Sequence, residues 1–159
     1  MVSKYFIFFD KKILIPARNT WIKKAWGNLP YSYVQDDEDL NKATYLDLKI
    51  NKWEVDRKWS THQAEEPWIR IELLNGVDVS NCLSENGFNH EKTPGFLLFF
   101  ELDGDGDEID YDLLDSLVAS LVNQQECNIY DELHNQIDKV VFIKKSLDNK
   151  KLKMKLENI

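Results

Sequence analysis

The densest group of residues able to do chemistry in this sequence is a run of aspartates interrupted by glycines. The run DGDGD occupies residues 103–107, and residues 101–115 contain eight acidic side chains in all. Carboxylate oxygens at this density are the ligands that Ca²⁺ and Mg²⁺ prefer. An EF-hand loop starting at the first aspartate fails, because its sixth position is Glu108 instead of glycine and its twelfth is Leu114 instead of a bidentate acid. A looser cation site is one hypothesis, and its candidate ligands are Asp103, Asp105 and Asp107.

A helix that starts directly after this run offers a second interpretation of the same acids. Apolar residues recur at i, i+3 and i+4 spacing in residues 113–122, which predicts a helix with one core-facing side. Acids near the start of a helix interact favourably with its dipole, and this role accounts for some of the carboxylates but not for all eight. The remainder suit contact with a cationic partner. The partner-binding candidates of this segment are Asp103, Asp105, Asp107, Glu108, Asp110 and Asp112.

A second acidic cluster lies in residues 28–42, which we predict to be a long loop. Four consecutive acids here follow two tyrosines, and a tryptophan occurs in a separate polar connection. Exposed aromatic side chains beside acids are typical of a protein interface, although the same residues could simply cover loops. The candidates that this composition indicates are Tyr31, Tyr33, Asp36, Asp37, Glu38, Asp39 and Trp59.

The familiar catalytic motifs do not occur in the sequence. The three histidines belong to no HExxH or HxH motif, the two cysteines form no CxxC, and no serine lies in a GxSxG elbow. The glycines of the acidic run cannot cradle phosphate, because carboxylates surround them. We therefore predict a protein that is not an enzyme and needs no cofactor. The alternative is a Ca²⁺- or Mg²⁺-dependent hydrolase that uses the acidic run as ligands and His90 or His134 as base.

Length and charge indicate the number of domains and the kind of partner that this protein can bind. A chain of 159 residues suits one domain with a real core, and it contains no apolar run long enough to cross a membrane. The net charge is −8, but residues 36–135 alone hold 24 acidic and seven basic residues. Such a surface repels nucleic acid and anionic lipid and attracts a basic protein. Two cysteines form no disulfide framework, so we expect reduced thiols and a cytoplasmic location.

The elements that must position these residues follow from hydrophobic patterning. The apolar run of residues 96–100 predicts a buried strand at the centre of the fold. Alternation of apolar and polar residues predicts half-buried strands at 45–53 and 67–74, with Trp53 and Trp68 at core positions. Further strands are expected at residues 4–9 and 13–15, and a terminal hairpin at residues 140–143 and 152–156.

Helices are expected to pack on this sheet. Besides the helix after the acidic run, helical patterns occur at residues 20–26, 80–86 and 129–137. Strands outnumber helices, and most strands are one-sided. We therefore predict a single α+β domain over residues 1–159, with a mainly antiparallel twisted sheet and two or three helices packed on one face.

In general character the chain resembles bacterial immunity proteins, which neutralise cognate toxins such as the secreted nucleases of contact-dependent inhibition systems. The resemblance rests on size, acidity, the α+β pattern and the lack of catalytic motifs. It implies that carboxylates of residues 36–39 and 103–112 mimic phosphate toward a cationic active site, and that Tyr31, Tyr33 or Trp59 adds affinity after docking. A structural subunit of a larger assembly is a third hypothesis, and the oligomeric state stays open.

Overall fold

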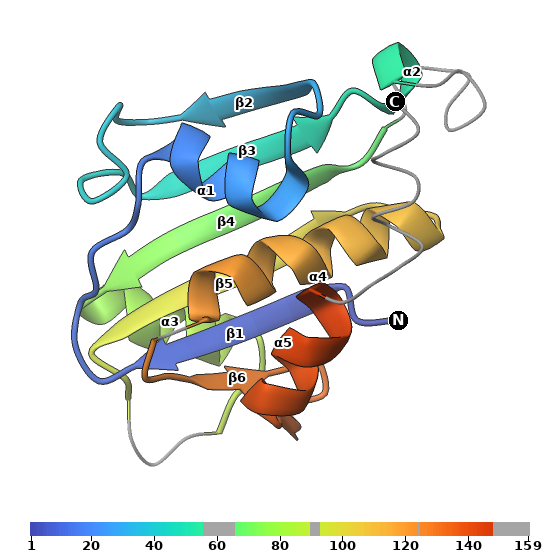
Figure 1. The fold of residues 1–159 in the computed structure, drawn as a ribbon. Coiled ribbons are helices and arrows are strands. Elements are labelled where there is room, and N and C mark those ends of the chain that lie inside the picture. The colour runs from blue at the N-terminus through green and yellow to red at the C-terminus, as the bar shows by residue number, and fades with distance from the viewer. Residues whose placement is uncertain (56–65, 90–92, 124, 148–159) are drawn as a thin grey trace.

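A seven-stranded antiparallel sheet is the framework of the fold (Figure 1). The computed structural model describes residues 1–55, 66–89, 93–123 and 125–147. The strands are β1 (Lys4–Phe9), β2 (Tyr31–Gln35), β3 (Tyr45–Ile50), β4 (Trp68–Asn75), β5 (Phe96–Asp103), β6 (Asn128–Tyr130) and β7 (Gln136–Ile137). Their order across the sheet is β2-β3-β4-β5-β1-β6-β7, and every neighbouring pair is antiparallel.

Helices cover the two faces of the sheet unequally. The helices in the described residues are α1 (Arg18–Trp26), α2 (Lys52–Val55), α3 (Val77–Glu85), α4 (Glu108–Val122) and α5 (Lys139–Leu147). Figure 1 shows α1, α4 and α5 on one face of the sheet and α3 on the other. The predicted α+β class, with an antiparallel sheet and three helices on one face, is confirmed. None of the described helices has the length and apolar character needed to cross a membrane.

The predicted unit of buried strand, acidic turn and helix is also confirmed. β5 is the middle strand of the sheet, and its first five residues are buried. The predicted apolar face of α4 is buried in full, namely Leu113, Leu114, Leu117, Val118, Leu121 and Val122. Asp107 and Asp110 form a capping box at the start of α4, in which each side chain accepts a hydrogen bond from the other residue's amide.

Two tryptophans of α1 hold this helix against α4. The Trp21 indole N–H donates to the backbone carbonyl of Leu117 at 3.1 Å, and that of Trp26 donates to the carbonyl of Leu113 at 2.9 Å. Both side chains are fully buried, so their polar N–H groups need these partners. Both helices therefore contribute to the core of the helix-covered face.

The opposite sheet face is only half covered. Apolar residues lie beneath α3, including Phe6, Phe8, Leu97 and Phe99. Towards β2 the same face carries a row of charged residues on adjacent strands, in which Lys4 lies opposite Glu101, Glu101 opposite Arg70, and Arg70 opposite Asp47. Alternation along each strand thus places apolar residues under the helices and charged residues on the part of this face beyond α3.

Two predictions for the N-terminal third were wrong. Residues 13–15 form no strand. The side chain of Asn41 instead bonds the backbone of Ile15, accepting from its N–H at 2.7 Å and donating to its carbonyl at 3.1 Å. The predicted loop at 28–42 contains the edge strand β2, which pairs with β3. Its sequence, YSYVQ, is rich in the aromatic and β-branched residues that favour strands.

The predicted helix at residues 129–137 was wrong as well. This segment forms β6, a tight turn and β7. The Asp131 carboxylate accepts from the amides of Leu133 and Asn135, and His134 has a φ of 65°, which no helix interior adopts. Local side-chain bonds of this kind favour turns over helices, so the i, i+4 apolar spacing was misleading.

Residues 140–143 were also assigned to the wrong element, because they belong to α5 instead of a strand. The Asp138 side chain accepts from the amide of Val141 at 3.0 Å and so stabilises the first turn of this helix. The other strand of the predicted hairpin, residues 152–156, lies outside the described residues. Intrinsic strand preference of the two valines was overridden by packing of α5 on α4.

The segment after β3 contains a further correction. β3 ends at Ile50, and Trp53 lies in α2 with 37% of its surface exposed, so it is not a core residue. The buried residue of α2 is Lys52, whose Nζ lies 2.9 Å from the Asp110 carboxylate. Only 5% of the Lys52 side chain and 8% of the Asp110 side chain are exposed. Trp68 is half-buried on the charged side of the sheet instead of in the helix-side core.

Gly95 precedes β5 at a point where the backbone has no room for a side chain. A Cβ atom there would lie 2.1 Å from the backbone oxygen of Asp10. Since backbone must move to relieve this overlap, we expect Gly95→Ala to lower the free energy of unfolding by about 1–3 kcal/mol. Urea denaturation followed by circular dichroism measures the change. The control Ser84→Ala, on the exposed side of α3, should stay within about 0.5 kcal/mol of the wild type, and equal stability of the two variants would contradict the prediction.

Candidate functional site

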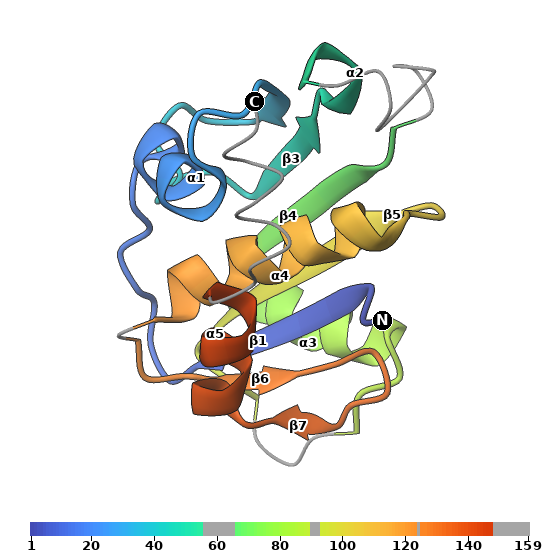
Figure 2. The same ribbon diagram turned by 45° about the vertical axis from the view of Figure 1, so that its right-hand side comes forward.

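A cavity of about 710 Å³ lies between α4, α5 and the start of β1. Figure 2 shows how the N-terminus, the two helices and the β6–β7 hairpin gather at this end of the molecule. Segments far apart in the sequence therefore contribute to one hollow. Its lining residues are Met1, Val2, Tyr5, Glu108, Tyr111, Asp112, Asp115, Asp131, Ile137, Asp138, Val141, Phe142, Lys145 and Ser146.

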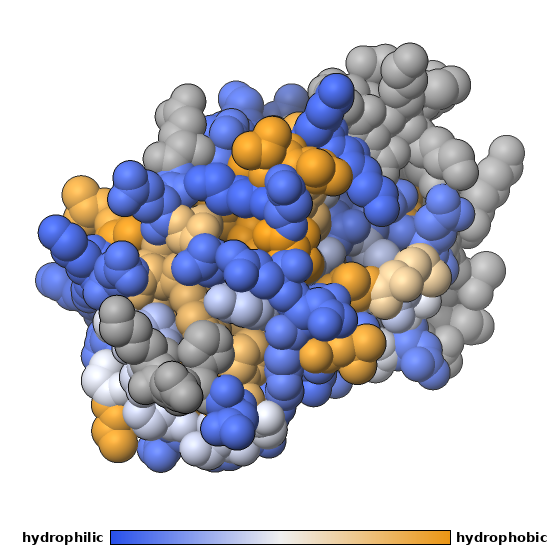
Figure 3. Space-filling view, turned by 90° about the horizontal axis from the view of Figure 1, so that it is seen from below, coloured by the Kyte–Doolittle hydropathy of each residue, from blue (hydrophilic) through white to orange (hydrophobic). Residues whose placement is uncertain are grey.

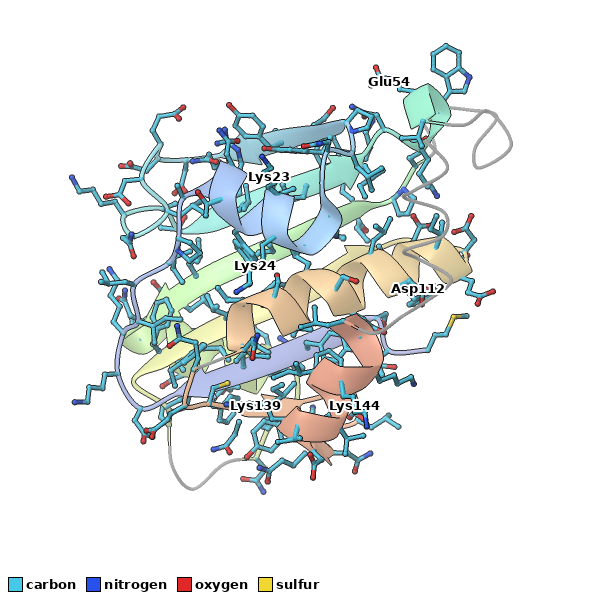
Figure 4. The ribbon with its side chains drawn as sticks, viewed as in Figure 1. Lys23, Lys24, Glu54, Asp112, Lys139 and Lys144 are labelled. Carbon is cyan, nitrogen blue, oxygen red and sulfur yellow. The ribbon has the colours of Figure 1, made fainter. Side chains whose placement is uncertain are left out.

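The cavity is strongly acidic. Its lining includes five carboxylates and one lysine. Figure 4 shows Asp112 on α4, the labelled Lys23 and Lys24 on α1, and the labelled Lys139 and Lys144 on α5. Carboxylates crowded around a hollow create a negative potential that attracts cations. The five carboxylates are Glu108, Asp112, Asp115, Asp131 and Asp138.

Asp115 and Tyr5 form a hydrogen-bonded pair in the wall of the cavity. The Tyr5 hydroxyl donates to Asp115 Oδ1 at 2.5 Å. Burial is the main reason that the pKa of the Asp115 carboxyl rises to about 6; the charge of Asp112 also raises it, while the Tyr5 hydroxyl and Lys145 lower it. Burial likewise raises the pKa of the Tyr5 hydroxyl, so Tyr5 stays protonated and acts as the donor. A carboxyl with a perturbed pKa in a cavity is a candidate functional group.

Apolar side chains form the remainder of the cavity wall. Phe142 packs on Tyr5 with ring centroids 5.4 Å apart, and Val141 is 62% exposed beside them. Figure 3 views the molecule from the side of α5 and β7 and shows apolar patches bordered by hydrophilic residues. An apolar centre with a charged rim is the usual composition of a protein-binding surface.

Two of the predicted site residues, Glu108 and Asp112, lie in this cavity. Asp103 lies elsewhere, in a smaller hollow of about 420 Å³ on the charged sheet face, and Asp105 is exposed on the turn. Asp110 is buried against Lys52, so its carboxylate is a structural group that no partner can contact.

The carboxylates of residues 36–39 mainly build their own loop. Asp36 accepts hydrogen bonds from the amide and the hydroxyl of Thr44, and the hydroxyl is the main cause that lowers the pKa of this aspartate. Asp39 accepts from the amide of Asn41 at 3.0 Å, which likewise lowers its pKa. Asp37 and Glu38 belong to the same turn, where both backbone carbonyls accept from the side chain of Gln35.

The predicted tyrosines lie on the side of β2 that faces α1. The Tyr31 hydroxyl donates to Asn19 at 2.8 Å, and the Arg18 guanidinium lies 3.4 Å above the Tyr33 ring. These contacts attach α1 to the edge of the sheet. Trp59, the remaining aromatic candidate, lies outside the described residues.

The structure does not join the two predicted acidic clusters into one surface. Gln35 is in register with Phe100 through β3 and β4, so Asp103 lies three residues further along β5, away from the loop of residues 36–39. Figure 1 shows the loop after β2 and the turn after β5 at opposite ends of the sheet. The two acidic clusters therefore lie on separate parts of the molecule.

The alternative metal-dependent site gains no support from the geometry. Among the described residues, no three carboxylate, histidine or cysteine side chains come together in a way that could hold a metal ion. His134 lies near α3, where its Nε2 is 3.0 Å from the carbonyl of Asn86 and its ring packs on Phe88. His90, the other proposed base, lies outside the described residues.

Sequence reasoning missed most of the cavity. Asp115 could have been found, because Glu108, Asp112 and Asp115 recur at the i, i+4, i+7 spacing of one helix face. Asp131 and Asp138 carried no such signal. Asp131 was assigned to a helix, and both residues reach the cavity only through the β6–β7 hairpin.

Neither a protein-family model, nor a curated protein, nor a solved structure matches this chain.

The raised pKa of Asp115 has a measurable consequence for stability. In the folded protein Asp115 keeps its proton up to about pH 6, whereas the unfolded chain releases it near its ordinary pKa of 3.8. The unfolded state thus binds fewer protons between these values, so this group makes the protein less stable as the pH rises from about 4 to 6.

We expect Asp115→Asn to remove this effect, because asparagine carries no charge and its side-chain oxygen can still accept from Tyr5. The variant should be more stable than the wild type by about 1–3 kcal/mol at pH 7, and this difference should fall towards zero at pH 4. Urea denaturation at four pH values measures it, with exposed Asp78→Asn as the control. Parallel pH profiles of the wild type and Asp115→Asn would contradict the assignment.

Proposed function

We propose that this protein binds a basic protein partner through the acid-lined cavity between α4 and α5. The observation that carries the proposal is the arrangement of five carboxylates around a partly apolar hollow of about 710 Å³. Carboxylates attract a cationic partner over long range and accelerate its association, and the apolar centre contributes affinity once water is excluded. The partner surface therefore combines basic side chains with apolar ones.

Inhibition of a toxin is the role that this binding mode suits best. A nuclease binds an anionic substrate through a cationic surface, and an acidic protein that covers this surface blocks the substrate. The general resemblance to immunity proteins supports the same role, and so does the charge of residues 36–135, which hold 24 acidic and seven basic residues. In this role the protein is a cytoplasmic inhibitor and not an enzyme.

Two variants of equal charge change test the proposal. Glu108→Gln combined with Asp112→Asn removes two carboxylates from the cavity, whereas Asp78→Asn combined with Glu85→Gln removes two exposed acids from α3 on the other sheet face. The purified protein is mixed with the product of the adjacent reading frame, and affinity is measured at low and high salt together with the toxin's activity.

We expect the cavity variant to bind about tenfold more weakly at low salt, with the difference shrinking as salt rises, because the lost interaction is electrostatic. The α3 variant should bind as the wild type does. Equal affinity of the two variants would place the interface elsewhere, and a partner whose affinity ignores salt would contradict the electrostatic mechanism.

A further inference from the structure

We infer that the acid-lined cavity receives one arginine side chain of the partner, with its guanidinium donating to the Asp115 carboxylate. This inference rests on the proposed function for the origin of the arginine. It goes further by naming the residue recognised, the group that recognises it and the dependence of binding on pH.

The arrangement of α4 suits a long, cationic side chain. Glu108, Asp112 and Asp115 follow one another along one face of the helix, from its exposed first turn to the half-buried Asp115 in the wall of the cavity. Seven residues of helix span about 10 Å. The acids of the first turn therefore lie at the entrance, where they attract the incoming cation, and Asp115 lies at the inner end, where the guanidinium would be held.

Aromatic rings favour arginine over lysine at the inner end. Tyr5, Tyr111 and Phe142 line the cavity beside Asp115, and Tyr5 and Phe142 already pack on each other. A planar guanidinium stacks on aromatic rings and is less strongly hydrated than an ammonium group, so its burial is less costly.

The hydrogen bonding of Asp115 leaves an acceptor for this donor. Among the described residues, the hydrogen bond to Asp115 comes from the Tyr5 hydroxyl and engages Oδ1. The second oxygen, Oδ2, is the atom towards which a guanidinium N–H would donate. Tyr5 would hold the carboxylate in place while the arginine binds, which makes Tyr5 a positioning residue.

The charges around Asp115 come from every element that surrounds it. Asp112 on α4 is a neighbouring like charge, whereas Lys145 on α5 and the amino terminus are the cations that act on Asp115. Asp131, next to β6, and Asp138, before α5, add negative charge to the lining. Glu132 also acts on the Tyr5 hydroxyl through its charge. Negative groups thus outnumber positive ones, and one added cation improves the balance.

Proton release follows from the same geometry. Burial and Asp112 raise the pKa of Asp115 to about 6, so part of the protein carries a neutral Asp115 near that pH. The arriving guanidinium stays protonated and stabilises the ionised carboxylate, so the proton of Asp115 passes to the buffer. Since the ionised fraction of a group with a pKa of 6 falls about tenfold from pH 7 to pH 5, the affinity should fall by about the same factor.

The test uses a small probe and needs no protein partner. Acetyl-arginine amide is titrated into the full-length protein at pH 5 and pH 7, followed by NMR and by calorimetry in two buffers of different ionisation enthalpy. Acetyl-citrulline amide is the uncharged isostere, and acetyl-lysine amide distinguishes the two cations. We expect saturable shifts of Tyr5 and Asp115 signals with the arginine probe, binding about tenfold weaker at pH 5, and weaker binding of lysine. Citrulline should not bind.

Variants assign the effect to this carboxylate. Asp115→Asn should weaken probe binding about tenfold or more and abolish its pH dependence, while Asp47→Asn, at a carboxylate of the charged sheet face, should change neither. Asp112→Asn, which leaves the Tyr5–Asp115 pair intact, should weaken binding while the pH dependence remains.

Three results would overturn the inference: equal binding of citrulline, unchanged pH dependence in Asp115→Asn, or no binding of the arginine probe. These outcomes are separate from the fate of the proposed function. A partner that loses affinity with Glu108→Gln and Asp112→Asn while no probe binds would keep the function and reject the arginine. Binding of the arginine probe, with no protein partner found, would support the arginine site and reject the proposed function.

Discussion

Replacing Lys52 by methionine should lower the free energy of unfolding by about 3–5 kcal/mol, which is the expected result of leaving a buried charge without its partner. Lys52 Nζ lies 2.9 Å from Asp110, and both side chains are almost completely buried. Asp110 also accepts the amide of Asp107 in the capping box of α4, so its position is set by the helix as well as by the ion pair. Methionine fills a similar volume but supplies no charge and no donor.

The destabilisation should depend on pH in a defined direction. Burial raises the pKa of Asp110 even with Lys52 present, and removal of this cation raises the pKa further. The folded variant therefore binds a proton at Asp110 more strongly than its unfolded chain does, so its stability deficit should shrink as the pH falls from 7 to 4. Denaturation in urea at both pH values measures this change.

Matched variants separate the ion pair from other effects of the substitution. Lys42→Met removes an exposed lysine and should change stability by no more than about 0.5 kcal/mol. Combining Lys52→Met with Asp110→Asn should restore part of the loss at pH 7, since no buried charge remains. A loss of stability in Lys52→Met that stays constant with pH would contradict this account. So would a double variant that is less stable than Lys52→Met alone.

Replacing Trp26 by alanine should cost about 3–5 kcal/mol, whereas the same change at Trp53 should cost at most about 1 kcal/mol. Trp26 is fully buried, and its indole N–H donates to the Leu113 carbonyl of α4. Alanine would leave a large cavity between α1 and α4 and would remove the hydrogen bond that joins the two helices. Trp53 is 37% exposed in α2, and its backbone amide, which donates to Glu66, is kept in the alanine variant.

This pair of variants also tests whether Trp53 is a core residue, as the sequence pattern predicted, or a partly exposed residue, as in the structure. Alternation of apolar residues predicted Trp53 at a core position of a strand, while the structure ends that strand at Ile50. Thermal and urea denaturation of both alanine variants measure the difference in stability. The emission maximum of the tryptophans that remain in each variant is recorded as well. Equal losses of stability would return Trp53 to the core and would contradict the described position of α2.

What the sequence by itself determined is the architecture around its strongest local patterns. The apolar run of β5 and the helical spacing of α4 are patterns among residues that are close in the sequence. These patterns therefore identify the buried residues of both elements directly. The α+β class followed for the same reason, because most strands alternate between a buried and a solvated face. The acidic composition that motivates a basic partner is likewise a property of the sequence alone.

Only the tertiary structure decided where the charges lie. In the sequence Asp110 is indistinguishable from the other acids around it. In the structure it is a buried group that pairs with Lys52, which lies 58 residues away in the sequence. Asp112 and Asp115 share a cavity with Asp131 and Asp138 because the β6–β7 hairpin brings the later segment beside α4. A carboxylate's role depends on which neighbours remove water from it or supply opposite charge, and for these residues the neighbours come from distant parts of the chain.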